Sequence, residues 1–167
     1  VIYNYFIFKI KMNFMENSHK DCIFCRIISG EIPSYKVYED ENYFAFLDIN
    51  PNTPGMTLLV PKKHYDSYAF DMPDEDYKNL LLKAKELGKM LDKKLGTMRT
   101  ALVMEGMGVN HVHVKLYPLH GLGKDFKPMI PKEKKFFEKY PGYLITTLGP
   151  QADDSFLSEI QKKITEV

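Results

Sequence analysis

The chain has 167 residues, of which 44% are apolar, so it is long enough and apolar enough to form one packed core. Twenty-three basic and 22 acidic residues leave a net charge of +1, which argues against electrostatic binding to nucleic acid or to an anionic membrane. The only two cysteines form a Cys-x2-Cys pair, which excludes a disulfide scaffold, and no apolar run approaches the ~18 to 20 residues needed to cross a bilayer.

The first twenty residues are predicted to be a peripheral or disordered extension. Their apolar run, VIYNYFIF, is followed rather than preceded by Lys9 and Lys11, which is the reverse of a secretory signal. We therefore expect a cytoplasmic protein.

A short helix is expected between Asp21, a candidate N-cap, and Gly30, which suits a left-handed residue at the helix end. A long helix is expected from Pro73 to Gly96, because acidic residues follow the proline and apolar residues recur at helical spacing up to the glycine. Its expected apolar stripe consists of Tyr77, Leu80, Leu81, Ala84, Leu87, Leu91 and Leu95.

Strand-like runs cover residues 35–38, 43–48, 56–61, 99–105 and 111–118. With the two helices, this order predicts an α+β fold with a mainly antiparallel sheet of about five strands. We assign the domain to residues 21–123. Residues 124–167 are expected to form an extension that packs on this domain, with a helix over 132–140, a strand over 143–148 and a last helix after Asp153 or Asp154.

The most informative run begins at His111. On a strand, side chains alternate between faces, so His111, His113, Lys115 and Tyr117 are expected to share one face. The residues expected on the buried face are Val112, Val114 and Leu116. Two imidazoles and an ammonium make a site for an anion, and imidazole can act as a nucleophile or as a general acid–base. A half-exposed strand with its polar residues outside is the alternative.

Four runs carry a family resemblance: DCIFCRIISGEIP at 21–33, FAFLDINP at 44–51, LVPKKH at 59–64 and HVHVKL at 111–116. The last resembles the histidine triad (HIT) motif, H-φ-H-φ-H-φ-φ with φ apolar, and the others are similar to the Hint-like branch of that family. The resemblance covers about residues 21–118.

The resemblance implies a HIT-like fold and a hydrolase or nucleotidyl transferase that acts at the α-phosphate of a purine nucleotide derivative. By position, His113 would attack the phosphorus and form a nucleotidyl-histidine intermediate. The implied base and ribose pocket comprises Phe24, Ile27, Ile32, Phe46 and Asp48, and Asp48 would accept hydrogen bonds from the ribose hydroxyls. Ordinary core packing is the alternative for Phe24, Ile27 and Ile32. The resemblance also implies a homodimer.

Two positions depart from the family pattern. Lys115 stands in place of the third histidine, and it can neutralise phosphate charge without reproducing the hydrogen-bond geometry of an imidazole. Met107 and Gly108 stand roughly where the family has Gln and Ser, so Gly108 would offer a phosphate only its backbone N–H. A nucleotide-binding regulator without turnover is therefore a second interpretation, and a zinc-stabilised interaction module is a third.

The Cys-x2-Cys pair, Cys22 and Cys25, is typical of metal ligation or of redox chemistry. The strand that should precede a redox pair in a βαβ unit is missing, whereas two cysteines with two distant histidines suit tetrahedral Zn²⁺. By resemblance the ligands would be Cys22, Cys25, His64 and His111. Such a closed site would be structural, and His113 would remain the catalytic imidazole of that strand. A reduced structural cysteine pair is the other alternative.

Overall fold

The computed structural model describes residues 21–142 and 144. The chain divides into two compact units, residues 1–124 and 125–167. The expectations for residues 1–20, for the strand at 143–148 apart from Leu144, and for the last helix lie outside the described residues, and the packing of the extension stays a prediction.

One antiparallel sheet forms the centre of the first unit, which confirms the predicted α+β fold. Its strand order is β1-β2-β3-β5-β4, and every neighbouring pair is antiparallel. The strands are β1 (Lys36–Glu39), β2 (Tyr43–Leu47), β3 (Thr57–Pro61), β4 (Thr100–Val103) and β5 (Val114–Pro118). The central strand β3 is buried along its whole length, so side chains cover both of its faces.

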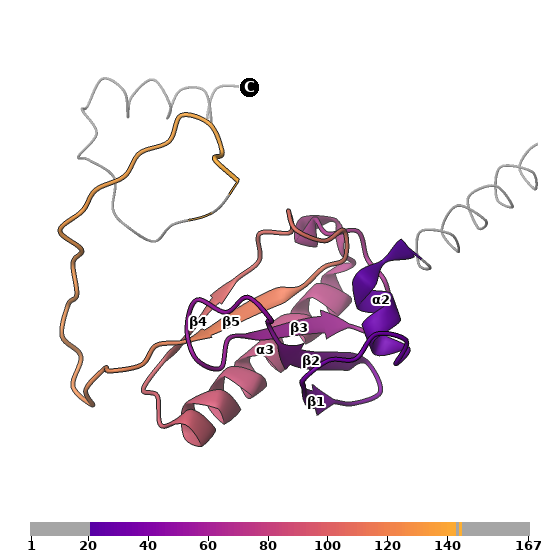
Figure 1. The fold of residues 1–167 in the computed structure, drawn as a ribbon, viewed down its shortest axis with the longest axis horizontal. Coiled ribbons are helices and arrows are strands. Elements are labelled where there is room, and N and C mark those ends of the chain that lie inside the picture. The colour runs from indigo at the N-terminus through magenta and orange to yellow at the C-terminus, as the bar shows by residue number, and fades with distance from the viewer. Residues whose placement is uncertain (1–20, 143, 145–167) are drawn as a thin grey trace, which may run out of the picture. The chain divides into compact units, whose positions relative to one another are not determined.

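The long helix α3 (Asp74–Leu95) covers one face of the sheet, chiefly at β4 and β5 (Figure 1). It begins after Pro73 and ends at Gly96, which takes the left-handed conformation with φ of 68°, as the sequence predicts. Most of its predicted apolar stripe is buried, but Leu95 in the last turn is 40% exposed. The core on this side comprises Ala45, Leu59, Met72, Leu80, Ala84, Leu87, Leu91, Val112, Val114 and Leu116.

The short helix α2 (Ile23–Ile28) packs against the other face, where its Phe24 and Ile27 are buried. Its N-cap is Cys22 without a side-chain capping bond, so the prediction of Asp21 as the cap is wrong. The strand residues beneath it are Phe44, Phe46, Leu58 and Val60. A 3-10 turn, η1 (Ala69–Asp71), precedes α3. No helix of the described ranges is both long and apolar enough to span a membrane.

The helix predicted over residues 132–140 is wrong. Neither residues 125–142 nor Leu144 lie in a helix or strand, and residues 132–140 are all exposed. A nine-residue helix between two prolines has too few turns to be stable without a packed apolar face.

Asp40 joins the β1–β2 turn to α3. Its carboxylate accepts hydrogen bonds from the backbone N–H groups of Asn42 (2.9 Å) and Tyr43 (2.7 Å) and from the Tyr38 hydroxyl (2.8 Å), and it pairs with Lys83 at 3.1 Å. Burial raises the pKa of Asp40, but these hydrogen bonds outweigh burial and lower the pKa to about 2.

The Asp40→Asn variant is therefore expected to lose stability at neutral pH and to lose part of its pH dependence. A carboxyl whose pKa is lowered by folding stabilises the native state above its unfolded pKa of about 3.9, and this contribution fades as the pH falls toward 2. We expect the free energy of unfolding, measured with urea, to fall by about 1 to 2 kcal/mol at pH 7 and to change very little at pH 2. The value at pH 7 allows for the partial exposure of Asp40. Glu75→Gln, in an exposed pair with Lys78, is the control, and equal losses in both variants would contradict the assignment.

Candidate functional site

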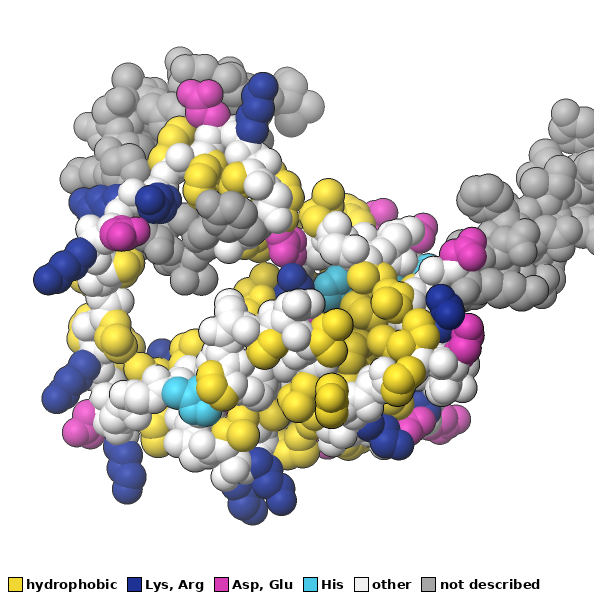
Figure 2. Space-filling view, in the orientation of Figure 1, with side chains coloured by type: hydrophobic (Ala, Val, Ile, Leu, Met, Phe, Trp, Pro, Cys, Tyr) yellow, Lys and Arg dark blue, Asp and Glu magenta, His cyan; other side chains and the backbone are white. Residues whose placement is uncertain are grey.

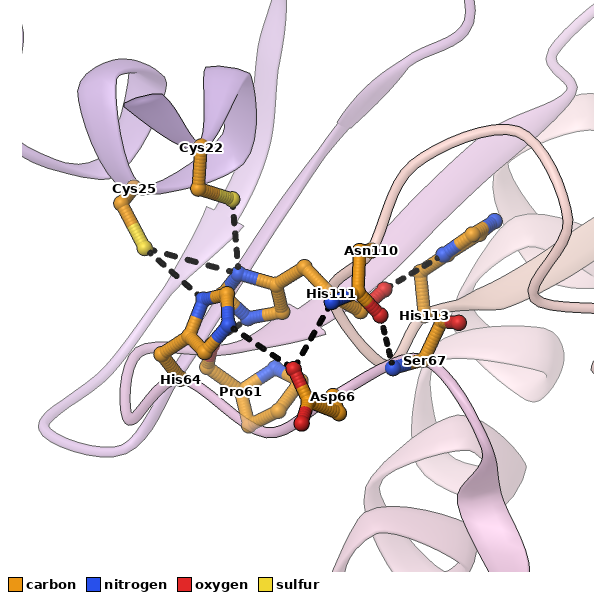
Figure 3. A network of polar contacts seen from close by, with 9 residues as sticks. All are labelled: Cys22, Cys25, Pro61, His64, Asp66, Ser67, Asn110, His111 and His113. Atoms are coloured by element: carbon orange, nitrogen blue, oxygen red, sulfur yellow. Dashed lines mark hydrogen bonds and ion pairs between the residues drawn. The ribbon is translucent and has the colours of Figure 1, made fainter. Parts of the chain in front are cut away.

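The four residues predicted as metal ligands lie together. Their ligand atoms all lie within 4.8 Å of one another, although the residues come from the start of α2, the segment after β3 and the segment before β5. His64 Nδ1 is 3.3 Å from Cys25 Sγ, and His111 Nδ1 is 3.4 Å from Cys22 Sγ and 3.6 Å from Cys25 Sγ (Figure 3). The two sulfurs and two nitrogens thus form a compact set of donors.

These separations fit a tetrahedral ion. Ordinary zinc–sulfur and zinc–nitrogen bond lengths place neighbouring ligand atoms about 3.5 Å apart. The Nε2 of His111 has the outer contact usual for a metal-binding histidine, since it donates to the Pro61 carbonyl (2.9 Å), whereas His64 Nε2 lies 3.8 Å from Asp66 Oδ1, which is longer than a hydrogen bond. The donation by Nε2 leaves the lone pair of His111 Nδ1 directed toward the sulfurs.

The Cys25 thiol is held in its protonated form by its surroundings. Burial raises the pKa of the Cys25 thiol to about 12, and the hydrogen bond with Cys22 and the charge of that neighbour add to the effect. Cys22 is itself buried, and both cysteines are free thiols. Since metals bind thiolates, an ion in this cluster would displace both protons and offset the repulsion between the sulfurs.

The two histidines lie on one side of the chain, as predicted, because both rings contact Phe24 while Val112 packs in the core on the α3 side, but the predicted start of the strand at residue 111 is wrong. β5 begins only at Val114, and the backbone of residues 111–113 is not part of the sheet. Both histidines are buried, and Figure 3 shows the His111 ring directed toward the cysteines and the His113 ring directed away from them. The expected alternation holds along the whole run, with Val112, Val114 and Leu116 in one core and with Lys115 and Tyr117 half-buried between apolar neighbours.

His113 is prepared to act through one nitrogen. Its Nδ1–H donates to the backbone carbonyl of His111 at 2.7 Å, so the lone pair of the neutral ring lies on Nε2. Burial lowers the pKa of His113, and Lys115 adds to this effect, whereas the His111 carbonyl and the charges of Glu105 and Asp48 oppose it. A neutral, oriented imidazole can serve as a nucleophile or as a proton acceptor.

The apolar residues predicted to line a pocket gather beside His113. Phe24 lies edge to face with His113 at 5.3 Å and with Phe46 at 5.6 Å between ring centroids. Ile27 is buried in the same cluster, and Ile32 packs against it half-buried. Figure 2 shows hydrophobic side chains gathered over α2 and the adjoining sheet, with a histidine and a basic side chain at the border of this patch.

Asp48 follows β2 and is half-buried. Its Oδ1 accepts a hydrogen bond from the backbone N–H of Asn50 at 2.8 Å, which fixes the carboxylate in a turn. Its charge acts on both His113 and Tyr117 by raising their pKa values, so the structure places Asp48 in their electrostatic neighbourhood.

The two glycines before β5 differ in their surroundings. Gly108 is exposed, and a Cβ there would meet nothing within 4 Å. Gly106 has φ of 75°, and a Cβ there would lie 2.5 Å from the Ser67 carbonyl oxygen. The chain before β5 therefore passes closely over the segment after His64, and Gly106 permits this contact.

Sequence reasoning missed Asn110 and Glu105. Asn110 accepts from the Ser67 N–H at 2.9 Å and donates to Asp66 Oδ1 at 2.8 Å, so it fastens the two histidine-bearing segments together. Glu105 pairs with Lys115, with 3.4 Å between Oε2 and Nζ. Its position directly after an apolar strand run is the same signal that identifies Asp48.

Comparison with known proteins shows the family. The HIT domain profile matches residues 29–124, and the chain therefore belongs to the HIT family. It is 48% identical over 102 residues to a HIT-like protein of Methanocaldococcus jannaschii, which covers 58% of this chain and 78% of that protein. It is 41% identical over 103 residues to an adenosine 5'-monophosphoramidase of Saccharomyces cerevisiae, which covers 58% of this chain and 61% of the yeast protein.

Solved structures agree with this assignment. A Streptococcus mutans protein superimposes with a TM-score of 0.64 at 30% identity, over 87% of this chain and 84% of that one. A zinc-bound histidine triad family protein of Mycobacterium smegmatis superimposes with a TM-score of 0.57 at 28% identity, over 65% of this chain and 83% of that one.

Protein purified without chelator is expected to hold one equivalent of zinc, and Cys25→Ser is expected to lose it. Binding energy at a closed site is also folding energy, so chelation or this substitution should lower the melting temperature by about 10 °C or more. Elemental analysis and a thermal melt measure both effects. The control is His120→Ser, since His120 is exposed and lies outside the cluster. Metal-free protein that melts at the same temperature with and without added zinc would contradict the site.

Proposed function

We propose that this protein hydrolyses or transfers nucleotidyl groups at the α-phosphate of a purine nucleotide derivative, with His113 as the nucleophile. The observation that carries the proposal is the orientation of His113, whose Nδ1–H is held by the His111 carbonyl and whose ring packs against Phe24 of a buried apolar cluster. Membership of the HIT family supports it, and so do relatives in yeast and Candida albicans that are named adenosine 5'-monophosphoramidases.

In this reaction His113 Nε2 forms a bond to the α-phosphorus while the bond from phosphorus to the leaving group breaks. The leaving group takes a proton from solvent as it departs. Water or another acceptor then attacks the phosphorus of the nucleotidyl-histidine, the bond from phosphorus to Nε2 breaks, the acceptor's proton passes to solvent, and neutral His113 is restored. The His111 carbonyl stabilises the intermediate, because the imidazole becomes electron-poor while its Nδ1–H still donates to that oxygen.

The pocket residues bind the rest of the nucleotide. We propose that Phe24, Ile27, Ile32 and Phe46 enclose the base, and that Asp48 accepts hydrogen bonds from the ribose hydroxyls. Gly108 would contribute only its backbone N–H to the phosphate, and Lys115 would contribute charge. These roles rest on the family pattern and on the contact of this apolar cluster with His113 through Phe24.

We further propose Zn²⁺ in the cluster of Cys22, Cys25, His64 and His111. With four protein ligands the ion would leave no position for substrate, so it would supply structural cross-linking rather than chemistry. Redox chemistry of the cysteine pair is less well supported, since both sulfurs contact histidine nitrogens.

We also propose a homodimer. β4 is an edge strand, and a groove of about 240 Å³ beside it is lined mainly by apolar side chains, together with Ser67 and Glu105. The apolar side chains include Tyr68, Phe70 and Leu102, which are 60%, 74% and 44% exposed. Apolar side chains gathered at a sheet edge are typical of a surface that a second copy covers.

A nucleotide-binding regulator without turnover is the second candidate. The observation that favours it is Lys115, which replaces the third histidine and is already paired with Glu105. Failure to bind any nucleotide would instead favour the zinc-stabilised interaction module.

His113→Ala is expected to abolish turnover of an adenosine 5'-phosphoramidate and the nucleotidyl adduct on the protein, while AMP binding is retained. The substitution removes the only atom that forms the covalent bond and leaves the pocket residues in place. Intact-mass spectrometry of quenched reactions detects the adduct, and calorimetry measures binding. His120→Ala is the control. Undiminished turnover in His113→Ala would discard the nucleophile and hence this mechanism.

Asp48→Ala is expected to weaken AMP binding about ten- to a hundredfold, because hydrogen bonds to two ribose hydroxyls are lost, on the order of 1 to 3 kcal/mol. A 2',3'-dideoxy nucleotide should bind the wild type more weakly than AMP and should lose no further affinity for the variant. Equal affinity of variant and wild type for AMP in calorimetry would remove Asp48 from the site.

A further inference from the structure

The ammonium of Lys115 forms an ion pair with Glu105 next to the candidate site. Its Nζ lies 3.4 Å from Oε2 of Glu105, and the side chains are 24% and 13% exposed, so the pair is largely withdrawn from water. Attraction between charges is stronger in such a place than on an open surface. Lys115 must therefore loosen its contact with Glu105 before it can bind a phosphate fully.

The register of the sheet explains why the two residues meet on the face that carries α2. Lys115 on β5 lies opposite Leu58 on β3 and opposite Val103 on β4. Leu58 belongs to the cluster under α2, and Glu105 follows Val103 by two residues, the spacing that returns to the same side of an extended chain. Glu105 is thereby brought beside the strand that continues from His113.

A second carboxylate acts on the same place. The charges of Glu105 and Asp48 both raise the pKa values of His113 and Tyr117, whereas Lys115 lowers them. Two carboxylates and one ammonium thus act on the candidate nucleophile by charge, and the ammonium is already paired with Glu105. A site with this balance does not favour a ligand that brings several further negative charges.

We propose that Glu105 is a specificity-determining residue, which holds Lys115 in an ion pair beside His113 and so selects nucleotide conjugates whose leaving group is uncharged or cationic over those whose leaving group carries further phosphates. This inference rests on the proposed function and names the leaving-group class. An amine leaving group adds no negative charge next to Glu105. A nucleoside diphosphate leaving group adds several, and it meets both the Glu105 carboxylate and a lysine that is already neutralised.

Glu105→Gln tests the inference, because it removes the charge and keeps the shape. The measurement is kcat/KM for an adenosine 5'-phosphoramidate with an uncharged amine and for diadenosine triphosphate. The wild type should prefer the phosphoramidate. The variant should shift the ratio toward the triphosphate about tenfold, the order expected when one unit charge is removed a few ångströms from a multiply charged group.

Two further variants separate charge from structure. Glu105→Asp keeps the carboxylate and should keep the wild-type ratio, whereas a packing defect would disturb both substrates in either variant. Glu75→Gln, in the exposed pair with Lys78, is the control for loss of a surface charge and should also leave the ratio unchanged. An unchanged ratio in Glu105→Gln, or an equal shift in Glu75→Gln, would overturn the proposal.

Binding distinguishes this inference from the proposed function. If the wild type turns over neither substrate and forms no adduct, the catalytic proposal fails, and the dissociation constants of adenosine, AMP and ADP then decide the role of Glu105. Glu105→Gln should lower the dissociation constant of ADP more than that of AMP, and it should leave the dissociation constant of adenosine unchanged. Equal changes for all three ligands, or no binding of any of them, would overturn the inference.

Discussion

His111 makes three contacts that tie the candidate metal cluster to the candidate nucleophile. Its Nδ1 faces the two cysteine sulfurs, its Nε2–H donates to the Pro61 carbonyl, and its own carbonyl accepts the Nδ1–H of His113. Because His111 is fully buried, none of these contacts competes with water. The position of His113, and with it the proposed chemistry, depends on this one residue being fixed, and an ion in the cluster would fix it further.

The sheet is covered on both faces, and this makes room for the candidate site on one of them. α3 covers one face with aliphatic side chains and supplies the larger core, so the other face is left for the short α2 and the candidate site. β3 is buried on both sides, and the segment that follows its last residue carries His64 to Cys25 of α2. Burial against Phe24 of α2 also limits the contact of His113 with water, which strengthens the influence of nearby charges on its ring.

Much of the fold and of the candidate site could be predicted from the sequence. The features that could not be predicted have physical causes. The bounds of α3 follow from Pro73 and Gly96. Proline is tolerated only at the start of a helix, because it has no backbone N–H to donate, and Gly96 readily takes the left-handed conformation that ends one. The four candidate ligands were predicted by resemblance, and the structure brings them together. Register across β4 and β5 is not visible in sequence, so the meeting of Glu105 with Lys115 was missed. The late start of β5 at Val114 was missed because His111 and His113 alternate with valines as strand residues do, while their backbone makes contacts outside the sheet.

The most direct test of the account is the protonation of the His113 ring in solution. Two-bond ¹H–¹⁵N correlation spectra of protein labelled on histidine, with the signal assigned by comparison with His113→Gln, distinguish the two neutral tautomers from the charged ring. The account predicts a neutral ring at pH 7 with the hydrogen on Nδ1 and a lone pair on Nε2, as the contact with the His111 carbonyl requires. A ring that carries its hydrogen on Nε2, or on both nitrogens at this pH, would contradict it.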